Sequence, residues 1–303
     1  MLNSMPPAWS RRVRALPEFA DTRQWNCLRH GRHSEVWRVT LASGATLIAK
    51  RGVGAEVREA QVYHDLLDPL ALPHPTVFAA LPDGDAQILL MEDLGSETVN
   101  SRPTVDRFAE AARTLADLRR HAAARLHQNG WPATVLATYA LPADTYRVSV
   151  QRVMDRAGLD PPQRGVLTRV RETLPRHVER LYDTGRMTIT HNDFNAKNLI
   201  VTAHGVRAID WSHAELTPHL GDLYCLLRDA ARHGVAEPDV MGPYLARDPV
   251  TDSAWHISMG GLCWLIRGLH WTWDIGSRMP DVAPVTAAMV GAMAECLDRM
   301  EYA

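Results

Sequence analysis

The 303-residue sequence predicts an α+β protein of two lobes, a small mostly β lobe followed by a larger mostly α lobe. Strand periodicity dominates residues 24–50, and helical periodicity dominates from residue 104 onward. Residues 92–102, which lie between these regions, are polar and contain glycine, as is typical of a hinge. We therefore expect an N-terminal lobe of residues 1–94, a C-terminal lobe of residues 95–303, and a cleft between them.

The small lobe begins with a predicted meander of strands. Apolar residues occupy alternate positions in residues 35–41, the period of a strand with one buried face. The Ala-Ser-Gly sequence at 42–44 is a hairpin signal, and residues 46–50 form the returning strand. Residues 55–67 have apolar positions spaced as on one face of a helix. Two more strands are expected over residues 76–80 and 86–91.

The larger lobe is predicted to be helical, with a short island of strands near its middle. The expected helices cover residues 104–128, parts of 143–157, 161–183, 219–233, 251–272 and 283–300. The expected strands cover residues 187–190, 199–201 and 206–209.

The overall composition argues against several classes of protein. Hydrophobic residues make up 46% and charged residues 22%, which is ordinary for a globular protein. The formal net charge of −2 argues against a nucleic-acid partner, which usually requires a basic excess. The four cysteines form no C-x-x-C pair, so we expect no zinc site, no disulfide framework and a cytoplasmic location. No apolar run approaches the roughly 18 residues of a membrane span.

The motif with the clearest chemistry is H-x-D-x-x-x-x-N at residues 191–198, which is followed by Asp210 in an Ile-Asp-Trp sequence. Phosphoryl transfer requires a carboxylate at the acceptor hydroxyl and oxygen ligands for Mg²⁺. Asp193 can supply the first, and the amide of Asn198 with the carboxylate of Asp210 can supply the second. The four residues between Asp193 and Asn198 allow one loop to present both groups on the same side.

Lysine is scarce in this chain, which gives its two lysines special interest. Of the 33 lysines and arginines, only Lys50 and Lys197 are lysine. A general drift from lysine to arginine explains the bias, so a lysine that persists is a candidate for a role closed to a planar guanidinium. Lys50 ends a strand and Lys197 lies inside the motif described above.

These motifs resemble those of the aminoglycoside phosphotransferase and choline kinase superfamily, which shares the protein-kinase fold. The HNDFNAKN sequence at 191–198 is similar to the catalytic loop of that family, and Ile-Asp-Trp at 209–211 is similar to its metal-binding motif. Gly-Asp-Leu at 221–223 resembles the start of the helix that follows. The resemblance implies a two-lobed protein-kinase-like fold in which Asp193 is the catalytic base. It also implies Mg²⁺ as cofactor, with Asn198 and Asp210 as its ligands.

The same resemblance implies a site for a nucleoside triphosphate, either ATP or GTP. Lys50 would hold the phosphates and Glu59, on the following helix, would pair with it, with Glu56 as the alternative partner. Two interpretations of Lys197 stay open: its ammonium touches the transferred phosphate, or its side chain covers the loop. The remaining nucleotide-binding candidates come from the expected phosphate-covering loop and the adenine-binding hinge: Gly31, Ser34, Glu92 and Leu94.

A tryptophan group near the C-terminus lies where the family builds its acceptor pocket. Its members are Trp255, Trp264, Trp271 and Trp273, and Asp274 follows them directly. One interpretation is helix-face packing in the core. The other is an aromatic wall for an ammonium group, because indole faces attract cations. In that interpretation, the substrate-binding candidates are Trp271, Trp273 and Asp274.

We therefore predict a kinase that transfers the γ-phosphate of a nucleoside triphosphate to a hydroxyl of a small acceptor. An aminoglycoside or similar amine-bearing antibiotic is one expected acceptor, and choline, an amino alcohol or a sugar is the alternative. A non-catalytic nucleotide-binding module is the third hypothesis, although the base, the metal ligands and the lysine are all present. We expect no nucleic-acid or membrane partner, and the sequence leaves the oligomeric state open.

Overall fold

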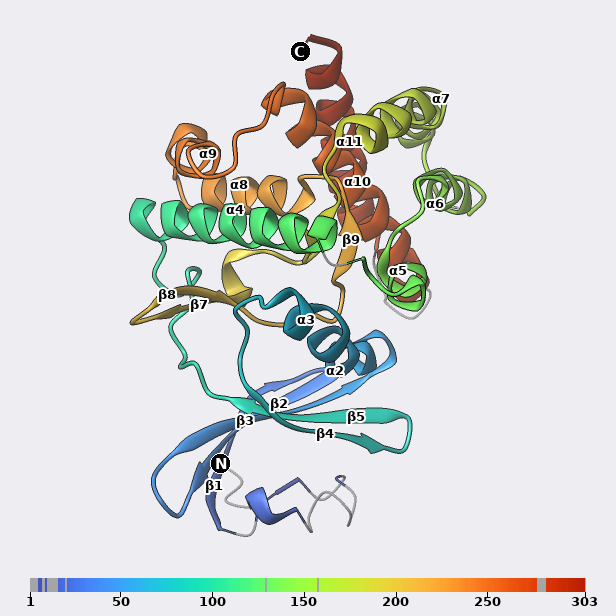
Figure 1. The fold of residues 1–303 in the computed structure, drawn as a ribbon. Helices are drawn as coiled ribbons and strands as arrows, with labels where there is room; N and C mark the ends of the chain where they lie inside the picture. The colour runs from blue at the N-terminus through green and yellow to red at the C-terminus, as the bar shows by residue number, and fades with distance from the viewer. Residues whose placement is uncertain are drawn as a thin grey trace. The chain divides into compact units, whose positions relative to one another are not determined.

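The computed structural model describes residues 5–6, 9, 16–19, 21–128, 130–156, 158–276 and 282–302, without the side chains of residues 273–276. Contacts divide the chain into two compact units (Figure 1). The first contains residues 1–101 and 198–213, and the second contains residues 102–197 and 214–303.

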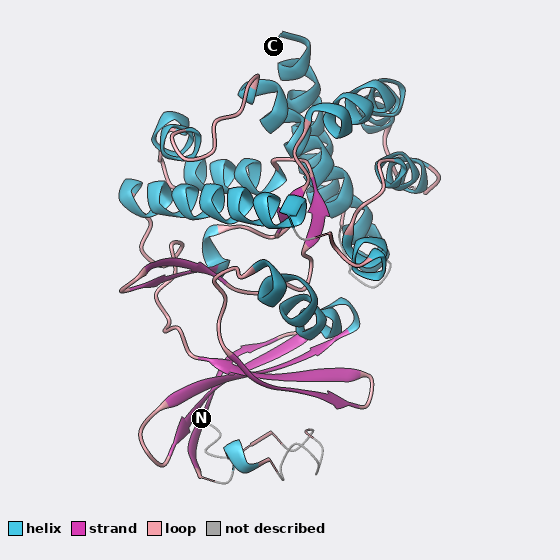
Figure 2. Cartoon of the chain, in the orientation of Figure 1, coloured by secondary structure: helices cyan, strands magenta, loops and turns pink. Residues whose placement is uncertain are grey.

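A five-stranded antiparallel sheet forms the centre of the first unit (Figure 2). Its strands follow the order β1-β2-β3-β5-β4. Their bounds are β1 Thr22–His30, β2 Ser34–Leu41, β3 Thr46–Val53, β4 Val77–Asp83 and β5 Ala86–Glu92, and the 3-10 helix η1, Pro17–Phe19, precedes them. The predicted meander over residues 24–50 is confirmed, as are the two later strands.

The sheet owes its stability to an aromatic cluster that it shares with the N-terminal segment. The cluster contains Trp9, Phe19, Trp25, Trp37, Val39, Leu47, Ala49, Ile88 and Leu90. Trp37 and Val39 alternate along β2 with less buried residues, as the sequence pattern predicts. The rings of Trp9 and Trp25 meet edge to face with centroids 5.5 Å apart, a favourable arrangement for aromatic pairs.

A helical segment follows β3, but it is less regular than the single helix predicted over residues 55–67. It consists of the 3-10 helix η2 (Gly54–Arg58), the α-helix α2 (Glu59–Val62), the π-helix η3 (Tyr63–Leu67) and the α-helix α3 (Asp68–Leu70). Pro69 lacks a backbone N–H and its ring crowds the carbonyl four residues earlier, which disfavours a regular α-helix through this point. The wider turn of η3 lies directly before it.

A hairpin from far along the sequence belongs to the first unit. Strands β7 (Leu199–Thr202) and β8 (Gly205–Ala208) pair antiparallel. The N–H of Val99 donates to the carbonyl of Leu199 at 2.9 Å, and the N–H of Val201 donates to the carbonyl of Glu97 at 2.8 Å. These bonds attach the hairpin to the segment that follows β5.

The second unit is helical, apart from the short antiparallel pair of β6 and β9 (Figure 2). Its elements are α4 Val105–Gln128, α5 Ala133–Tyr139, α6 Asp144–Met154, α7 Pro161–Thr184, β6 Thr188–Thr190, β9 Glu215–Thr217, α8 Gly221–Arg232, α9 Glu237–Leu245, α10 Ser253–Gly276 and α11 Ala283–Tyr302. The 3-10 helix η4, Ala196–Asn198, lies where the chain passes from the second unit to the first. The predicted long helices are confirmed, whereas α5, α9 and β9 are too short or too proline-rich to give a clear period.

Helices α8 and α10 pack unusually closely because glycine occupies their contact. A Cβ atom added at Gly260 would lie 2.5 Å from the carbonyl carbon of Leu220 and 2.7 Å from the backbone nitrogen of Gly221. At Gly261, an added Cβ would lie 2.5 Å from the ring of Tyr224. No helix in the described part of the chain combines the length and apolar character needed to cross a membrane.

Candidate phosphate-transfer site

Lys50 lies in a buried cluster of carboxylates in the first unit. Its place on β3, between Val36 of β2 and Leu89 of β5, leaves only 6% of the residue exposed. Its Nζ atom is 2.6 Å from Glu59 Oε2, 2.7 Å from Asp210 Oδ1 and 2.8 Å from Glu56 Oε2. The structure therefore brings together the predicted lysine, its predicted partner and a predicted metal ligand.

The charge of Lys50 is stabilised by its surroundings. Burial lowers the pKa of the ammonium, but the negative charges of Glu59, Asp210 and Glu56 raise it by more. The net result is a pKa above the ordinary value for lysine, so the group stays cationic at neutral pH. Three carboxylates around one ammonium leave the cluster with an excess of acceptor oxygens.

Glu59 is held from two further directions. Only 1% of it is exposed, and its Oε1 accepts hydrogen bonds from the Tyr63 hydroxyl at 3.3 Å and the Trp211 backbone N–H at 3.2 Å. Glu56 approaches Lys50 because position 52 is glycine, where an added Cβ would lie 2.5 Å from the Glu56 Cβ. Both the expected partner of Lys50 and its alternative therefore contact the ammonium.

Asn198 and Asp210 lie at the base of the β7–β8 hairpin. The N–H of Ile209 donates to the Asn198 carbonyl at 3.0 Å, which places Asn198 opposite the residue before Asp210. Asp210 adopts a φ of 68°, an uncommon conformation for a residue with a side chain. Its second oxygen, Oδ2, is 3.8 Å from an arginine of β1, Arg29. The hairpin thus supports both predicted metal ligands.

Asp210 belongs to a group of carboxylates whose oxygens are of the kind that a hard divalent cation binds, although Lys50 contacts all three of them in this structure. One oxygen from each of Glu56, Glu59 and Asp210 can be chosen so that all three lie within 4.8 Å of one another. Carboxylate and amide oxygens are the ligands that Mg²⁺ prefers. Asn198, which is 5% exposed, is joined through its backbone carbonyl to Ile209, the residue before Asp210, and its side chain offers an amide oxygen. The residues present are therefore compatible with the implied Mg²⁺.

The motif of residues 191–198 forms a loop that begins where β6 ends in the second unit. Both oxygens of Asp222, at the start of α8, accept backbone hydrogen bonds from this loop. His191 N–H donates at 2.7 Å and Asn192 N–H donates at 2.8 Å. Asn192 has a φ of 65°, so the chain turns sharply just before Asp193. A buried carboxylate thereby fixes the backbone that carries Asp193.

The Asp193 side chain is partly exposed and is held by its own loop. Its backbone N–H donates to His191 Nδ1 at 3.2 Å, and its Oδ1 accepts a short hydrogen bond from Asn195. Lys197 Nζ lies 3.6 Å from Asp193 Oδ2, with 60% of the lysine side chain exposed. The N–H of Ala196 donates to Asp229 Oδ2 at 2.9 Å, which attaches the end of the loop to α8.

The other nucleotide-site candidates occupy β-strand ends of the first unit. Gly31 N–H donates to the Ser34 carbonyl at 2.9 Å and closes a tight turn, within which Ser34 is buried. The Glu92 carboxylate accepts from the Thr76 N–H at 3.1 Å and the Thr76 hydroxyl at 3.2 Å. Glu92 therefore ties the end of β5 to the start of β4, and half-buried Leu94 follows it.

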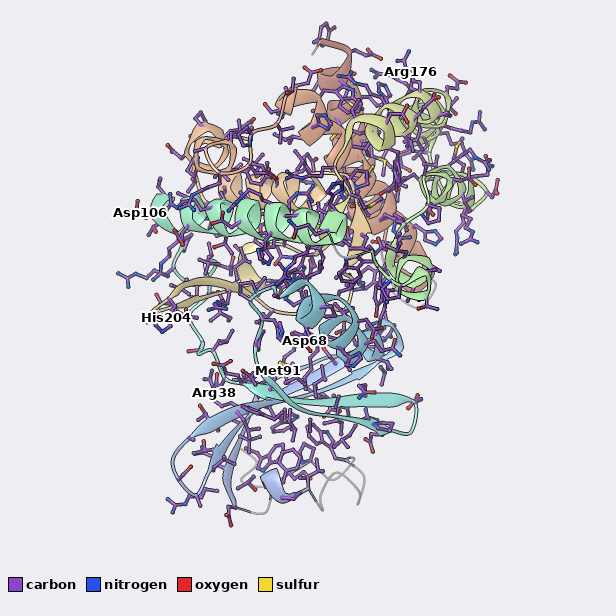
Figure 3. All side chains as sticks on the ribbon, viewed as in Figure 1. Arg38, Asp68, Met91, Asp106, Arg176 and His204 are labelled. Atoms are coloured by element: carbon purple, nitrogen blue, oxygen red, sulfur yellow. The ribbon has the colours of Figure 1, made fainter. Side chains whose placement is uncertain are left out.

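The segment after β5 is also fixed by an ion pair. The register places Arg38, Ile48 and Met91 in one row across β2, β3 and β5. Figure 3 labels Arg38 and Met91 of this row. Arg38 donates from Nε to Asp93 Oδ2 at 2.6 Å and from Nη2 to Asp93 Oδ1 at 2.9 Å. This two-bond geometry holds the backbone where the adenine-binding hinge is expected.

The tryptophans of α10 have different environments. Trp255 is 1% exposed, and the Arg180 guanidinium lies 4.0 Å from its ring, so Trp255 belongs to the core. Trp264 donates from Nε1 to the Asn192 carbonyl at 2.9 Å. Trp271 is 49% exposed. The side chains of Trp273 and Asp274 lie outside the described residues.

Several residues that support the Asp193 loop within the second unit were not predicted as site residues. They are Asp222, Asp229, Glu215 and Arg267. The Gly-Asp-Leu sequence at 221–223 was a usable signal for Asp222. Glu215 and Arg267 gave none, because their roles depend on the register of β9 and on the packing of α10.

Comparison with solved structures places this fold among known kinases. A choline/ethanolamine kinase family protein from Mesorhizobium loti has a TM-score of 0.65 and 15% identity, with 96% of this chain and 92% of that chain covered. Choline kinase LicA from Streptococcus pneumoniae has a TM-score of 0.65 and 14% identity, with 94% and 96% covered. A thermostable mutant of the aminoglycoside phosphotransferase APH(4)-Ia, solved with ADP and hygromycin B, has a TM-score of 0.64 and 15% identity, with 93% and 96% covered.

These likenesses define a protein-kinase-like fold, which confirms the predicted fold class. The model of the phosphotransferase enzyme family matches residues 25–247, which is most of the chain. The chain therefore belongs to the phosphotransferase enzyme family, and the predicted superfamily is confirmed. No curated protein sequence matches the chain.

Proposed function

We propose that this protein transfers the γ-phosphate of a nucleoside triphosphate, ATP or GTP, to a hydroxyl of a small acceptor. The observation that carries the proposal is the Lys50 ammonium at 2.6–2.8 Å from three carboxylates, one of them Asp210 of the Ile-Asp-Trp motif. A lysine fixed in this way offers a point charge to phosphate oxygens. Two of the similar structures carry the nucleotides ADP and AMP-PNP in their names, which supports nucleotide use here.

Each residue has a distinct part in the proposed reaction. Lys50, aimed by Glu59 and Glu56, holds phosphate oxygens of the nucleotide. Asn198 and Asp210 would hold Mg²⁺, which would supply positive charge to neutralise the phosphates. Asp193 accepts the proton of the acceptor hydroxyl and orients its oxygen toward the γ-phosphorus. Lys197, near Asp193, supplies a second cation for the transferred phosphate.

The supporting residues explain why Asp193 can act as a base. Asp222 fixes the backbone on its N-terminal side, and Asp229 fixes the backbone three residues later. The hydrogen bond from Asn195 sets the orientation of the carboxylate. A carboxylate that is positioned before the acceptor binds loses little entropy during the reaction.

Asp193→Asn tests the proposal, because it keeps the shape of the side chain and removes its ability to accept a proton. We expect phosphate transfer to fall roughly 10²- to 10⁴-fold, the usual contribution of a general base. The Kd for nucleotide, measured by calorimetry, should stay unchanged. Asp117→Asn on the surface of α4 is the matched control and should retain full activity.

The same measurements separate the proposal from its alternatives. Full transfer by the Asp193→Asn variant would remove this residue from its role. Nucleotide binding by the natural chain, with no transfer to any amino sugar, amino alcohol, sugar, hydroxy acid or antibiotic, would favour a non-catalytic binding module. The similar structures named for choline kinases and for an aminoglycoside phosphotransferase justify including both acceptor classes in that screen.

A further inference from the structure

An ion pair lies directly behind the Asp193 loop in the second unit. The register of β6 and β9 places Glu215 opposite Thr190, the residue before the loop begins. Glu215 is 7% exposed, and its Oε2 accepts from Asn192 Nδ2 at 3.1 Å. Its Oε1 accepts from Arg267 Nη2 of α10 at 2.6 Å. Glu215 therefore links an arginine to the residue that precedes Asp193.

The position of Arg267 is fixed by a second contact between α10 and the loop. Trp264, one helical turn earlier on the same face of α10, donates from its indole nitrogen to the Asn192 carbonyl at 2.9 Å. Asn192 is thus held through its carbonyl by Trp264 and through its side-chain amide by Glu215. These two contacts hold the guanidinium of Arg267 beside the loop before any acceptor binds.

The guanidinium of Arg267 retains unused hydrogen-bonding capacity. The side chain of Arg267 is 33% exposed, whereas the side chain of Glu215 is only 9% exposed. Within the described residues, Glu215 accepts a hydrogen bond from one of the five N–H groups of the Arg267 guanidinium. The rest of this planar group matches the two oxygens of a carboxylate or the oxygens of a phosphate.

The carboxylates around the loop, by contrast, already have donors. Asp222 accepts hydrogen bonds from two backbone N–H groups. Asp229 accepts a hydrogen bond from the Ala196 N–H and forms an ion pair with Arg232 at 2.8 Å. Helix α10 carries no aspartate or glutamate between Ser253 and Thr272. An acceptor with several ammonium groups would need carboxylates to offset the cost of desolvating them.

We propose that Arg267 determines acceptor specificity, and that the acceptor carries an anionic group, a carboxylate or a phosphate, near the hydroxyl that is phosphorylated. The inference rests on the proposed kinase function and narrows its acceptor class. It departs from the polycationic antibiotic expected from the sequence, because the side chain that Glu215 links to Asn192 is a partly exposed guanidinium and not a carboxylate. Arg267 acts in binding, and Asp193 keeps the proton-accepting role.

Matched sets of probes test this inference by varying charge at constant size. The three-carbon set is D-glycerate, glycerol and serinol, and the six-carbon set is D-gluconate, D-glucose 6-phosphate, D-glucose and D-glucosamine, with kanamycin as a polycation. We expect the highest kcat/KM for an anionic probe. The two anionic six-carbon probes distinguish a carboxylate from a phosphate as the recognised group.

Arg267→Gln should lower kcat/KM for the preferred anionic probe about 10- to 100-fold, chiefly through KM, as expected for loss of a charge-assisted hydrogen bond. The KM for nucleotide should not change. Arg267→Lys should recover part of the loss, because it restores the charge without the planar fork. Arg120→Gln, an exposed arginine of α4, is the matched control and should behave as the natural protein does.

The outcomes that overturn the inference differ from those that overturn the kinase function. No measurable transfer to any anionic probe, or a higher kcat/KM for a neutral or cationic probe, overturns it. An equal loss in Arg267→Gln for anionic and neutral probes also overturns it, because a merely structural residue would act on all probes alike. Failure of the protein to bind nucleotide would overturn the kinase function instead, and transfer that is unaffected by Asp193→Asn would remove only the proposed role of Asp193.

Discussion

At the scale of single residues, Lys50 shows how strongly its surroundings select one side chain. Its ammonium lies within 2.8 Å of three carboxylate oxygens in a position that is almost fully buried. A guanidinium is planar and larger, so it cannot place one nitrogen at the same distance from all three. The survival of lysine here, in a chain with only one other lysine, has a direct physical reason.

Lys50→Arg should therefore lower kcat/KM for nucleotide by about 10- to 100-fold, the effect of losing a well-placed charged hydrogen bond. The larger side chain should also lower the free energy of unfolding by roughly 1–3 kcal/mol, because it overfills a packed position. Steady-state kinetics and urea unfolding measure the two effects. Arg51→Lys, at the adjacent position on β3, is the control. Full activity in Lys50→Arg would mean that the cluster has no role in binding phosphate.

The candidate site residues that the sequence indicates most directly are those in compact motifs. Asp193 and Asn198 lie within eight consecutive residues, and Asp210 follows in a short sequence of its own. Glu56 was expected only as an alternative to Glu59, whereas both contact Lys50. That outcome depends on the close approach at Gly52, which spacing along the chain does not reveal.

At the scale of elements, the contact between α8 and α10 supports the Asp193 loop. Asp222, which holds the loop backbone, is the second residue of α8. The start of α8 lies against Gly260 of α10 so closely that backbone atoms occupy the space of a Cβ. The position of the loop therefore depends on a glycine that makes no contact with the reacting groups.

Gly260→Ala should reduce both stability and activity. The added methyl group must displace backbone atoms, which should lower the free energy of unfolding by roughly 1–3 kcal/mol. Movement of α8 should also lower kcat, while nucleotide affinity is retained. Chemical unfolding and kinetics on the same preparation measure both.

Gly165→Ala in α7 is the matched control, since no atom lies within 4 Å of the Cβ that would be added there. The control should be stabilised by about 0.5–1 kcal/mol, because alanine favours a helix. If Gly260→Ala behaved in the same way, the close helix contact would have no structural role.

Helices are predicted accurately from the sequence where their hydrophobic period extends over several turns. The helices over 104–128 and 161–183 were predicted to within one residue at each end. Strand β9 has only three residues, and α9 contains Pro238 and Pro243, so neither develops a readable period. Because the sequence does not predict β9, it gives no indication of Glu215, which is the partner of Arg267.

At the scale of the whole molecule, the fold class followed from the change in periodicity near residue 100. The family match covers residues 25–247, which includes Lys50 and the motifs at 191–198, 209–211 and 221–223. The C-terminal segment that follows, which contains α10 and α11, is the part in which the sequence left acceptor recognition open. Its partly exposed residues Arg267 and Trp271 now provide specific positions to test.

A crystal structure with Mg²⁺ and a non-hydrolysable ATP analogue tests the central claim most directly. We predict that the Lys50 ammonium contacts phosphate oxygens, that Asn198 and Asp210 bind the metal, and that the Asp193 carboxylate faces the γ-phosphate. A nucleotide bound elsewhere, with Lys50 still enclosed by Glu56, Glu59 and Asp210, would contradict the account.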